Sequence, residues 1–507
     1  MDSAPLCRAL SVAFLLALCA LPTLAATPAV GFDREAIQAA AQVLPMAGEL
    51  RVTAVPWALD GVSRSLSLRL ERFQVFAPGA RVVVHGAAGE RYLPFPENVY
   101  LRGEVEGEAG SRVVLSVLAS GEIRGLATAI GRTWLLGADA ADGTAGALRV
   151  RAADGPLELE RPGGGFRCAL DDIGPTAFRA GDGSADEALA AILDAPAGPT
   201  SAAAPHAVDG AAFDHTAVIA IETDNEFLNL PAFAGNTTDA TNYIADLVAY
   251  SSTIYTDELQ TSWVLGEVSL WAVADPWVIS DPGCGLLEFG RYWNLTHTAT
   301  VRTVSHFLSG KSTNAGIAWV GVLCRAPFSV NPVDFGGCAA PVNTTGSYGG
   351  GYGFTSGIDG NFNINSPSVV WDIEAFTHEI GHNFNSPHTH CYQNVGGNAA
   401  AVDNCYAGQC GTTGCFCGTA ALPGPAGSGA GTIMSYCHLL GGGLSNTSLT
   451  LGLGHPFGVM PERVPNRMRS HVVSIAAGNP ACLAPIGIVF VNGFASGNTG
   501  AWSATVP

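Results

Sequence analysis

Positive charge is scarce in this sequence of 507 residues. Lys311 is the only lysine, and 24 lysines and arginines stand against 43 aspartates and glutamates, which gives a formal net charge of −19. Proteins that bind nucleic acid or anionic lipid present clusters of basic side chains. We therefore expect no nucleic-acid partner and no binding to an anionic membrane surface.

Long apolar runs are absent from the sequence beyond its N-terminus. There, Arg8 precedes an apolar run over residues 9–21, and the small residues Ala25 and Ala26 follow. This order is typical of a cleaved export signal, and the run is too short for a comfortable membrane span. We predict a signal peptide at residues 1–26 and a secreted, extracellular protein that has no membrane span and is a monomer.

Cysteine is concentrated in the second half of the sequence. Cys7 and Cys19 lie in the predicted signal, and ten cysteines lie from Cys284 to Cys482. An even number of cysteines in an exported protein predicts disulfides, here up to five. Four of them could instead hold a second metal, but their spacing fits no usual zinc knuckle, which favours disulfides for Cys405, Cys410, Cys415 and Cys417. Cys168 remains as the odd cysteine of the mature region.

Two different patterns follow the signal. Residues 47–160 alternate short apolar runs with turns, as at 81–84 and 112–118, which is typical of an all-β region. The segment at 179–212 is rich in Ala, Gly, Pro and Asp. Such a composition buries little apolar surface, so we predict a flexible linker that proteases can cut.

Beyond the linker the pattern changes to mixed α/β. Apolar residues repeat at helical spacing from Ile244 to Tyr255, which predicts a long amphipathic helix. Residues 396–431 are rich in Gly, Ala and Cys, and we expect irregular, cross-linked structure there. The other candidate elements are strands at 215–221, 262–272 and 316–324 and helices at 286–293, 301–308 and 371–383.

One stretch carries residues suited to metal chemistry. His378, Glu379 and His382 form an HExxH motif, and His388 comes six residues after His382. On a helix, residues four apart lie on one face, so the first two histidines can bind one ion while Glu379 reaches a water on it. Three neutral imidazoles leave one tetrahedral position for water, which is the ligand set of a catalytic zinc site. We predict one catalytic Zn²⁺; nothing in the sequence indicates Ca²⁺.

Two further positions extend the motif. Met434 lies downstream in Gly-Thr-Ile-Met-Ser-Tyr, and the chain has only five methionines. The extended HExxH motif of one protease clan includes such a methionine, which supports the ligands without binding the metal. That motif has glycine where this sequence has Asn385. A turn there needs a positive φ, which asparagine tolerates best after glycine, so we expect Asn385 to bring His388 back to the metal.

With these motifs, residues from about 214 to 483 resemble the reprolysin-like (adamalysin) branch of the metzincin metallopeptidases, in a bacterial secreted form. The run at 316–324 resembles the edge strand of that family, and the region from Tyr100 through Gly125 resembles its propeptide. Two positions depart from the reprolysin pattern. Thr389 stands where Asp is usual, and Tyr436 stands where Pro is usual, as in astacins and serralysins.

The resemblance implies an α/β (α+β) metzincin-type catalytic domain, with a mixed twisted sheet and an active-site helix, preceded by a β-rich propeptide domain. The implied organisation is a signal peptide at 1–26, propeptide and linker at 27–205, a catalytic domain at 206–483 and a short tail at 484–507. The tail resembles one found on various secreted bacterial proteins, which extends the prediction to association with the cell surface.

The resemblance also implies a zinc metalloendopeptidase that acts on protein or peptide substrates. Zinc lowers the pKa of its bound water, Glu379 takes the proton, and the hydroxide attacks a peptide carbonyl. Tyr436 assists if it swings toward the site; the alternative is that it packs beneath the metal with Met434. His390 and His438 are competing histidines that fit no ligand template.

Cys168 lies just before the predicted linker. It resembles the cysteine switch of metzincin zymogens, in which a thiolate occupies the fourth zinc position and excludes water. An idle or mispaired thiol is the alternative.

Two other classes of function stay open. One is a catalytically idle binding module on a metzincin fold, against which Glu379 and the three intact histidines argue. The other is a zinc amidohydrolase acting on a non-peptide substrate, which the motif alone also fits. Chelator-sensitive cleavage of casein distinguishes a protease from both.

Overall fold

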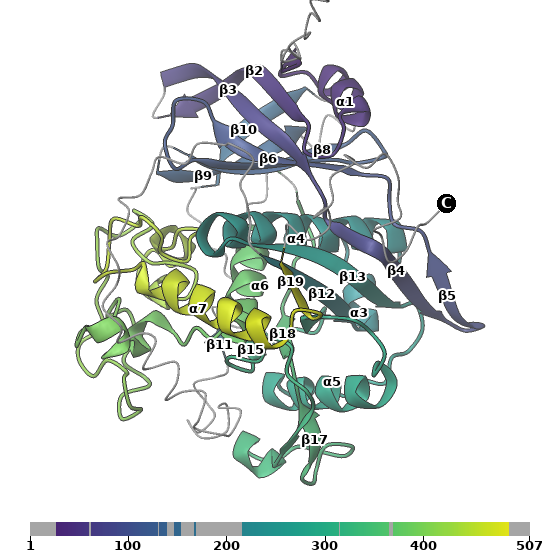
Figure 1. Cartoon of the computed structure of the whole chain (residues 1–507), viewed down its shortest axis with the longest axis vertical. Helices are drawn as coiled ribbons and strands as arrows, with labels where there is room; N and C mark the ends of the chain where they lie inside the picture. The colour runs from purple at the N-terminus through teal and green to yellow at the C-terminus, as the bar shows by residue number, and fades with distance from the viewer. Residues whose placement is uncertain are drawn as a thin grey trace, which may run out of the picture.

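The computed structural model describes residues 27–485 except 60–61, 130, 139–146, 154–166, 169–214, 314, 363 and 365–368. The predicted signal peptide and linker, and almost all of the predicted tail, lie outside the described residues. The described chain forms two large β-sheets, with the N-terminal sheet stacked over a long helix that covers the second sheet (Figure 1).

The N-terminal region is built of strands, as its alternating pattern predicts. Its eight described strands follow the order β1-β2-β3-β6-β7-β8-β9-β10, antiparallel except for the pair β1–β2. Trp57 and Trp134 meet edge to face in its core, with ring centroids 5.0 Å apart. The elements are β1 (Ala29–Gly31), α1 (Arg34–Val43), β2 (Glu49–Leu59), β3 (Val62–Phe73), β6 (Val99–Val105), β7 (Arg112–Val117), β8 (Ile123–Ala129), β9 (Arg132–Ala138) and β10 (Leu148–Ala152).

The second sheet is mixed, and segments far apart in the sequence meet in it. Its described strands follow the order β11-β15-β18-β14-β12-β13-β4-β5, with β19 beside β12. Neighbours run parallel except for β15–β18, β4–β5 and β12–β19. The strands are β4 (Phe76–Gly86), β5 (Gly89–Leu93), β11 (Arg167–Cys168), β12 (His215–Thr223), β13 (Thr261–Trp271), β14 (Val304–Ser309), β15 (Ala315–Ala318), β18 (Tyr352–Ser356) and β19 (Leu483–Pro485).

Helices cover both faces of this sheet, and three of the predicted helices are confirmed. A small hairpin pairs β16 (Phe328–Val330) with β17 (Gly346–Gly349) near α5. Among the described residues, no helix has both the length and the apolar character needed to cross a membrane. The helices are α3 (Asn225–Leu228), α4 (Thr237–Leu259), α5 (Pro282–Thr296), α6 (Val369–Asn383) and α7 (Arg463–Gly478), with short 3₁₀ turns η3 (Pro332–Phe335), η4 (Thr389–Cys391), η5 (Val395–Gly397), η6 (Cys437–Leu439) and η7 (Gly443–Asn446).

The prediction of a helix at 301–308 is wrong. This segment contains strand β14, which lies between β12 and β18 in the sheet, and all six of its residues are buried. A parallel strand that is buried on both faces has no polar side to alternate with, so its residues lack the two-residue period that identifies most strands. The strand predicted at 316–324 is shorter than expected, because β15 ends at Ala318.

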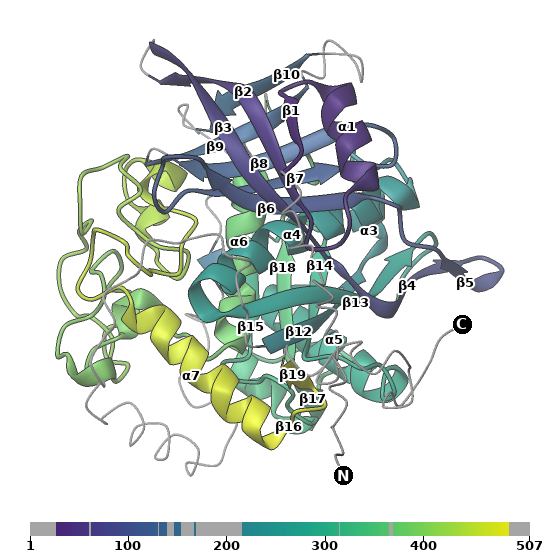
Figure 2. The same cartoon turned by 45° about the horizontal axis from the view of Figure 1, so that its top comes forward.

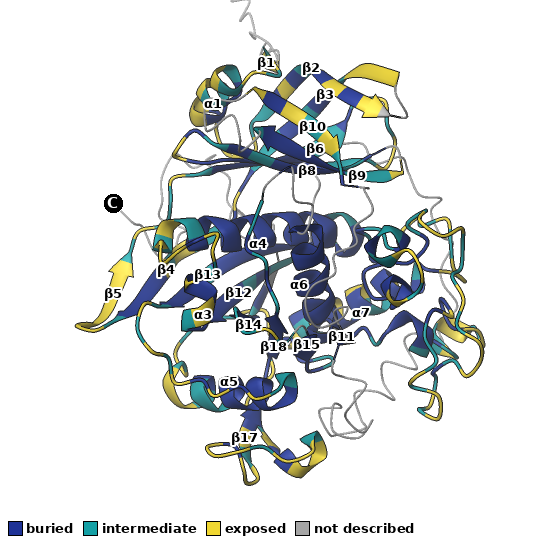
Figure 3. Ribbon diagram, turned by 180° about the vertical axis from the view of Figure 1, so that it is seen from behind, coloured by how far each residue is buried: buried dark blue, intermediate teal, exposed yellow. Residues whose placement is uncertain are grey.

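α4 lies between the two sheets and is buried along almost its whole length (Figure 3). Because both sides of the helix are covered, its polar residues need partners inside the protein. The Ser251 hydroxyl forms a hydrogen bond with Thr377 of α6 at 2.7 Å. The carboxylate of Glu258 accepts backbone N–H bonds from Leu451 at 2.9 Å and Leu453 at 3.1 Å. α4 therefore joins the N-terminal sheet, α6 and the loops near the C-terminus.

Five disulfides pair the ten cysteines of the second half, which confirms the disulfide interpretation. All four cysteines considered for a second metal site are bonded in this way. Cys324–Cys482 joins the segment after β15 to the segment before β19, and it closes the longest loop, with a sequence separation of 158. The other pairs are Cys284–Cys338, Cys391–Cys415, Cys405–Cys437 and Cys410–Cys417.

Glu374 is a buried carboxyl group on α6. Its side chain accepts one hydrogen bond, from the Thr447 hydroxyl at 2.9 Å, and the residue is 3% exposed. Because burial penalises the charged form, it raises the pKa of Glu374 to about 8.

Replacement of Glu374 by Gln tests this burial. Between about pH 4.5 and 8 the folded protein holds a proton here that the unfolded chain releases, so this group lowers the free energy of unfolding by ~1.4 kcal/mol per pH unit as pH rises. The Gln side chain cannot ionise and still accepts from Thr447. We expect Glu374→Gln to be more stable than the wild type at pH 8 and to have a flatter stability profile from pH 5 to 8 by urea unfolding. Glu97→Gln, at an exposed position, should keep the wild-type slope; an equal slope in both variants would contradict the assignment.

Candidate metal centre

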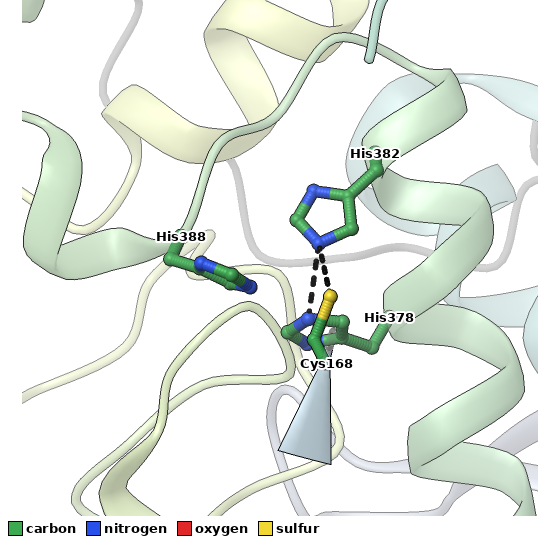
Figure 4. A group of neighbouring side chains, drawn as sticks. All are labelled: Cys168, His378, His382 and His388. Carbon is green, nitrogen blue, oxygen red and sulfur yellow. Dashed lines mark hydrogen bonds between the residues drawn. The ribbon is translucent and has the colours of Figure 1, made fainter. Parts of the chain in front are cut away.

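α6 supplies three of the predicted site residues. His378 and His382 lie one turn apart on the buried face of the helix, and their Nε2 atoms are 3.2 Å from each other (Figure 4). Glu379 is fully buried beside them. The helix ends at Asn383, whose side-chain amide donates at 2.9 Å to the carbonyls of Trp319 and Tyr352. These bonds fix the end of α6 against the sheet.

Asn385 makes the turn that leads to the third histidine. Its φ is +75°, the left-handed conformation expected from the sequence. Its backbone N–H donates to the carbonyl of His382 at 2.8 Å. Arg467 of α7 donates to the Asn385 carbonyl at 2.6 Å and to the side-chain oxygen at 3.0 Å. The side chain of Asn385 therefore accepts a hydrogen bond from Arg467 that glycine could not accept.

The turn brings His388 to the two helical histidines. The ring of His388 lies 5.2 Å from that of His378 and 4.8 Å from that of His382, measured between centroids (Figure 4). Cys168 joins the three histidines, and one ligand atom from each of the four residues lies within 4.8 Å of the others.

Met434 packs against α6 next to the site. It is fully buried, and its carbonyl accepts a hydrogen bond from the backbone of Thr389 at 3.0 Å, next to His388. A Cβ atom on Gly381 would lie 2.4 Å from the Met434 sulfur, so only glycine allows the helix to approach this closely. Met434 therefore packs directly against the helix that carries His378 and His382.

The three histidines are oriented by acceptors on their outer nitrogens. Nδ1 of His378 bonds to the Ile433 carbonyl at 2.7 Å, Nδ1 of His382 bonds to the Ser386 carbonyl at 2.6 Å, and Nδ1 of His388 bonds to the Gln409 side-chain oxygen at 3.2 Å. Carbonyl oxygens only accept, so each Nδ1 carries the proton and each Nε2 presents a lone pair to the common centre.

The spacing of these atoms fits zinc. Tetrahedral zinc with Zn–N bonds of ~2.0 Å and a Zn–S bond of ~2.3 Å places two nitrogens about 3.3 Å apart and a nitrogen about 3.5 Å from the sulfur. The two helical Nε2 atoms are 3.2 Å apart, and Cys168 Sγ is 3.5 Å from Nε2 of His382. Two lone pairs that face each other at this distance need a cation between them. These two distances match tetrahedral zinc, and His388 belongs to the same group of ligand atoms, which lie within 4.8 Å of one another.

Burial keeps the histidines neutral, as metal ligands must be. It lowers the pKa of His378 to about 4, and it lowers the pKa values of His382 and His388 well below their usual value. All three are buried, with His378 3% exposed. At neutral pH no proton competes with a metal for their Nε2 atoms.

Cys168 reaches the site from β11, which runs parallel to the edge strand β15 with Cys168 opposite Gly316. Its sulfur lies 3.6 Å from Oε2 of Glu379. Its carbonyl accepts a hydrogen bond from the Tyr436 hydroxyl at 2.9 Å. The sulfur, the carbonyl and the strand pairing together hold this segment across the site.

Glu379 lies between the ligands and the edge strand. A Cβ atom on Gly316 would come within 2.3 Å of the Glu379 carboxylate, so the strand backbone packs directly against it. This contact holds the carboxylate near the sulfur of Cys168 and restricts the space in which a reacting group could bind.

Tyr436 is fully buried beside the ligands. Its ring is 4.4 Å from that of His388, between centroids. Of the competing histidines, His390 turns its Nε2 to the Gln409 oxygen at 2.7 Å, and the His438 ring packs edge to face on Trp371 at 5.0 Å. Neither belongs to the group of four ligand residues.

Gln409 is a site residue that sequence reasoning missed. Its side-chain oxygen is shared by His388 and His390, and it lies next to Cys410 in the loop closed by Cys391–Cys415. The sequence around it contains no motif, and disulfide pairing is what brings this loop to the third histidine. Its neighbourhood in a cysteine-rich loop close after the ligands was the only available signal.

A metallopeptidase family matches part of the chain. Residues 214–446 match the family model Reprolysin_5, metallo-peptidase family M12. A solved structure with similarity to this chain is metalloproteinase-II from Bacteroides fragilis, at 11% sequence identity and a TM-score of 0.32, with 75% of this chain and 92% of that chain covered. No curated protein sequence matches the chain.

Gln409→Leu tests how strongly the loop positions the third ligand. Loss of the acceptor frees the tautomer and orientation of His388, so we expect zinc to bind about 10- to 100-fold more weakly. Gln409→Glu, which keeps an acceptor, should largely restore the affinity. Zinc dissociation constants measured by competition with a chromogenic chelator provide the readout. Gln393→Leu is the matched control, and an unchanged dissociation constant for Gln409→Leu would remove Gln409 from the site.

Proposed function

Because residues 214–446 belong to the reprolysin-like metallopeptidases of family M12 and the protein is a metallopeptidase, we propose that it is a secreted, monomeric zinc endopeptidase. It is made as a zymogen. One observation carries the proposal: the imidazoles of His378, His382 and His388 and the thiol of Cys168 lie around one point. Each imidazole is hydrogen-bonded to the protein through its Nδ1 atom. The predicted signal peptide and the five disulfides support export.

His378, His382 and His388 hold the metal in this proposal. When bound, zinc supplies a Lewis acid that makes water acidic and polarises a substrate carbonyl. Glu379 is the general base and then the general acid, because its carboxylate faces the position that the Cys168 sulfur occupies. It takes a proton from the attacking water and returns it to the leaving amine.

Strand β15 offers a place where a peptide substrate can bind. In the structure β15 pairs with β11 on its outer side. An extended peptide can pair with β15 in the same place once β11 has left, with main-chain hydrogen bonds that position the scissile bond. The Tyr436 hydroxyl donates to the Cys168 carbonyl. It can donate in the same way to a substrate carbonyl on which negative charge develops.

The zymogen state is the arrangement in which β11 occupies the site. A thiolate in the fourth ligand position leaves no place there for water. The pairing of β11 with β15 also occupies the edge that a substrate needs. Cleavage in the segment between residues 168 and 215 and departure of β11 would open both.

Glu379→Ala separates metal binding from proton transfer. The variant keeps all three imidazoles, so we expect one equivalent of zinc by atomic absorption and a loss of casein cleavage of at least about 100-fold. Glu462→Ala, outside the site, serves as the control. If the matured wild type binds one equivalent of zinc and shows no chelator-sensitive cleavage of casein, the endopeptidase proposal fails.

Cys168→Ala tests the thiol plug. With no sulfur to hold the fourth position, we expect the uncut precursor to cleave a peptide substrate, while the wild-type precursor stays silent. A second readout is independent of activity: the cobalt-substituted wild-type precursor should show thiolate-to-metal charge-transfer absorption that the variant lacks. A variant precursor that stays as silent as the wild type, or an absorption spectrum that does not change, would count against the plug.

A further inference from the structure

The N-terminal region contributes a strand to the sheet that holds the metal site. β4 runs parallel to β13, with Arg81–His85 opposite Glu267–Trp271 in continuous register and Phe76 opposite Leu265 before a shift in the register. Figure 2 shows the β4–β5 hairpin extending from the N-terminal sheet into the edge of the sheet below. β13 lies next to the central strand β12, so β4 covers an edge that would otherwise expose unpaired backbone.

Polar contacts reinforce this pairing. The guanidinium of Arg81 binds the carboxylate of Glu267 at 2.6 Å, and the Glu267 side chain is only 2% exposed. The ring of His85 stacks on Trp271 at 3.9 Å, and its Nε2 lies 2.9 Å from the Ser269 hydroxyl. Loss of β4 would leave the Glu267 carboxylate without its arginine at a newly exposed edge.

The rest of the interface combines partly buried ion pairs with a shared apolar core. Arg112 of β7 binds Asp257 at 2.6 Å and Glu258 at 3.3 Å on α4, and Arg124 of β8 lies 3.4 Å from the fully buried Asp246. One continuous apolar core crosses the boundary. N-terminal residues in it that are at most 6% exposed are Phe73, Val75, Val82, Val84, Tyr100, Val114, Leu126, Leu135 and Ala153.

The contrast with β11 is large. β11 pairs with the edge strand through two residues, Arg167 and Cys168, whereas β4 is an eleven-residue strand that pairs along β13 and shares the core. Separation of the N-terminal sheet would expose the core and the carboxylates of α4, whereas departure of β11 requires only the loss of a short pairing and of the thiol.

We propose that residues 27–153 stay bound to residues 215–485 through β4 after the connecting chain is cut, and that maturation removes only β11. The second clause rests on the zymogen function proposed above; the first does not. The N-terminal region then serves as the structural partner of the catalytic sheet, and a short peptide around Cys168 is the removable inhibitor.

A double cut tests the proposal on the full chain. Recognition sites for a specific protease are inserted within 154–166 and within 179–212, so that digestion releases the peptide with Cys168. No bond between the Cys168 sulfur and the metal can then hold the fragments together. We expect the N-terminal and C-terminal fragments to co-elute in gel filtration at physiological salt. Separate elution, whether the C-terminal fragment is folded or aggregated, would overturn the proposal. Because elution needs no substrate, a co-eluting but inactive complex would contradict only the proposed function.

Substitutions in the β4–β5 hairpin locate the anchor. Val84→Asp places a charge at a position with 0% exposure, and Arg91→Asp places the same residue at an exposed position of the same hairpin. We expect the first to separate the cut fragments and the second to leave them together. Arg81→Ala, at a half-exposed position, covers the case in which Val84→Asp does not fold. It should raise the dissociation constant of the two fragments about ten-fold, measured by dilution. If the fragments of Val84→Asp or Arg81→Ala bind each other as tightly as those of the wild type, the role of β4 is overturned.

Discussion

Three imidazoles point their lone pairs at one another inside a buried space, and this arrangement is unfavourable unless a cation lies among them. The protein maintains it with acceptors on the far side of each ring: two backbone carbonyls and one side-chain amide. The close packing of Met434 against Gly381 and the left-handed turn at Asn385 serve the same constraint. The histidines are therefore held by contacts within the protein, and burial keeps them unprotonated.

Local geometry explains which parts of the site could be predicted. A spacing of four residues on a helix fixes the relation of His378 to His382, and a need for positive φ makes asparagine an acceptable substitute for glycine at 385. The odd cysteine count singled out Cys168, which the structure places at the metal site. Gln409 was not predictable, because disulfide pairing that spacing does not encode brings its loop to His388.

The fold was predictable where strands alternate and less so where they do not. The antiparallel N-terminal strands and the helices α4, α5 and α6 follow their periodicity. Two parallel strands were harder to predict: β14 was expected to be helical, and β4 was expected to be a strand but not to belong to the second sheet. Such buried runs have no polar side, and their neighbours are distant in sequence, so their place in the sheet, and for β14 also its type, cannot be read locally.

The contact between Arg467 and Asn385 has a consequence for the order of events during synthesis. Arg467 belongs to α7, close to the C-terminal end of the described chain, yet it fixes the turn that presents His388. A nascent chain that emerges from N- to C-terminus has its first two histidines long before it has α7. The third ligand is therefore secured last, when the N-terminal sheet and Cys168 have already been made. The thiol of Cys168 is thus already present when the third imidazole is fixed.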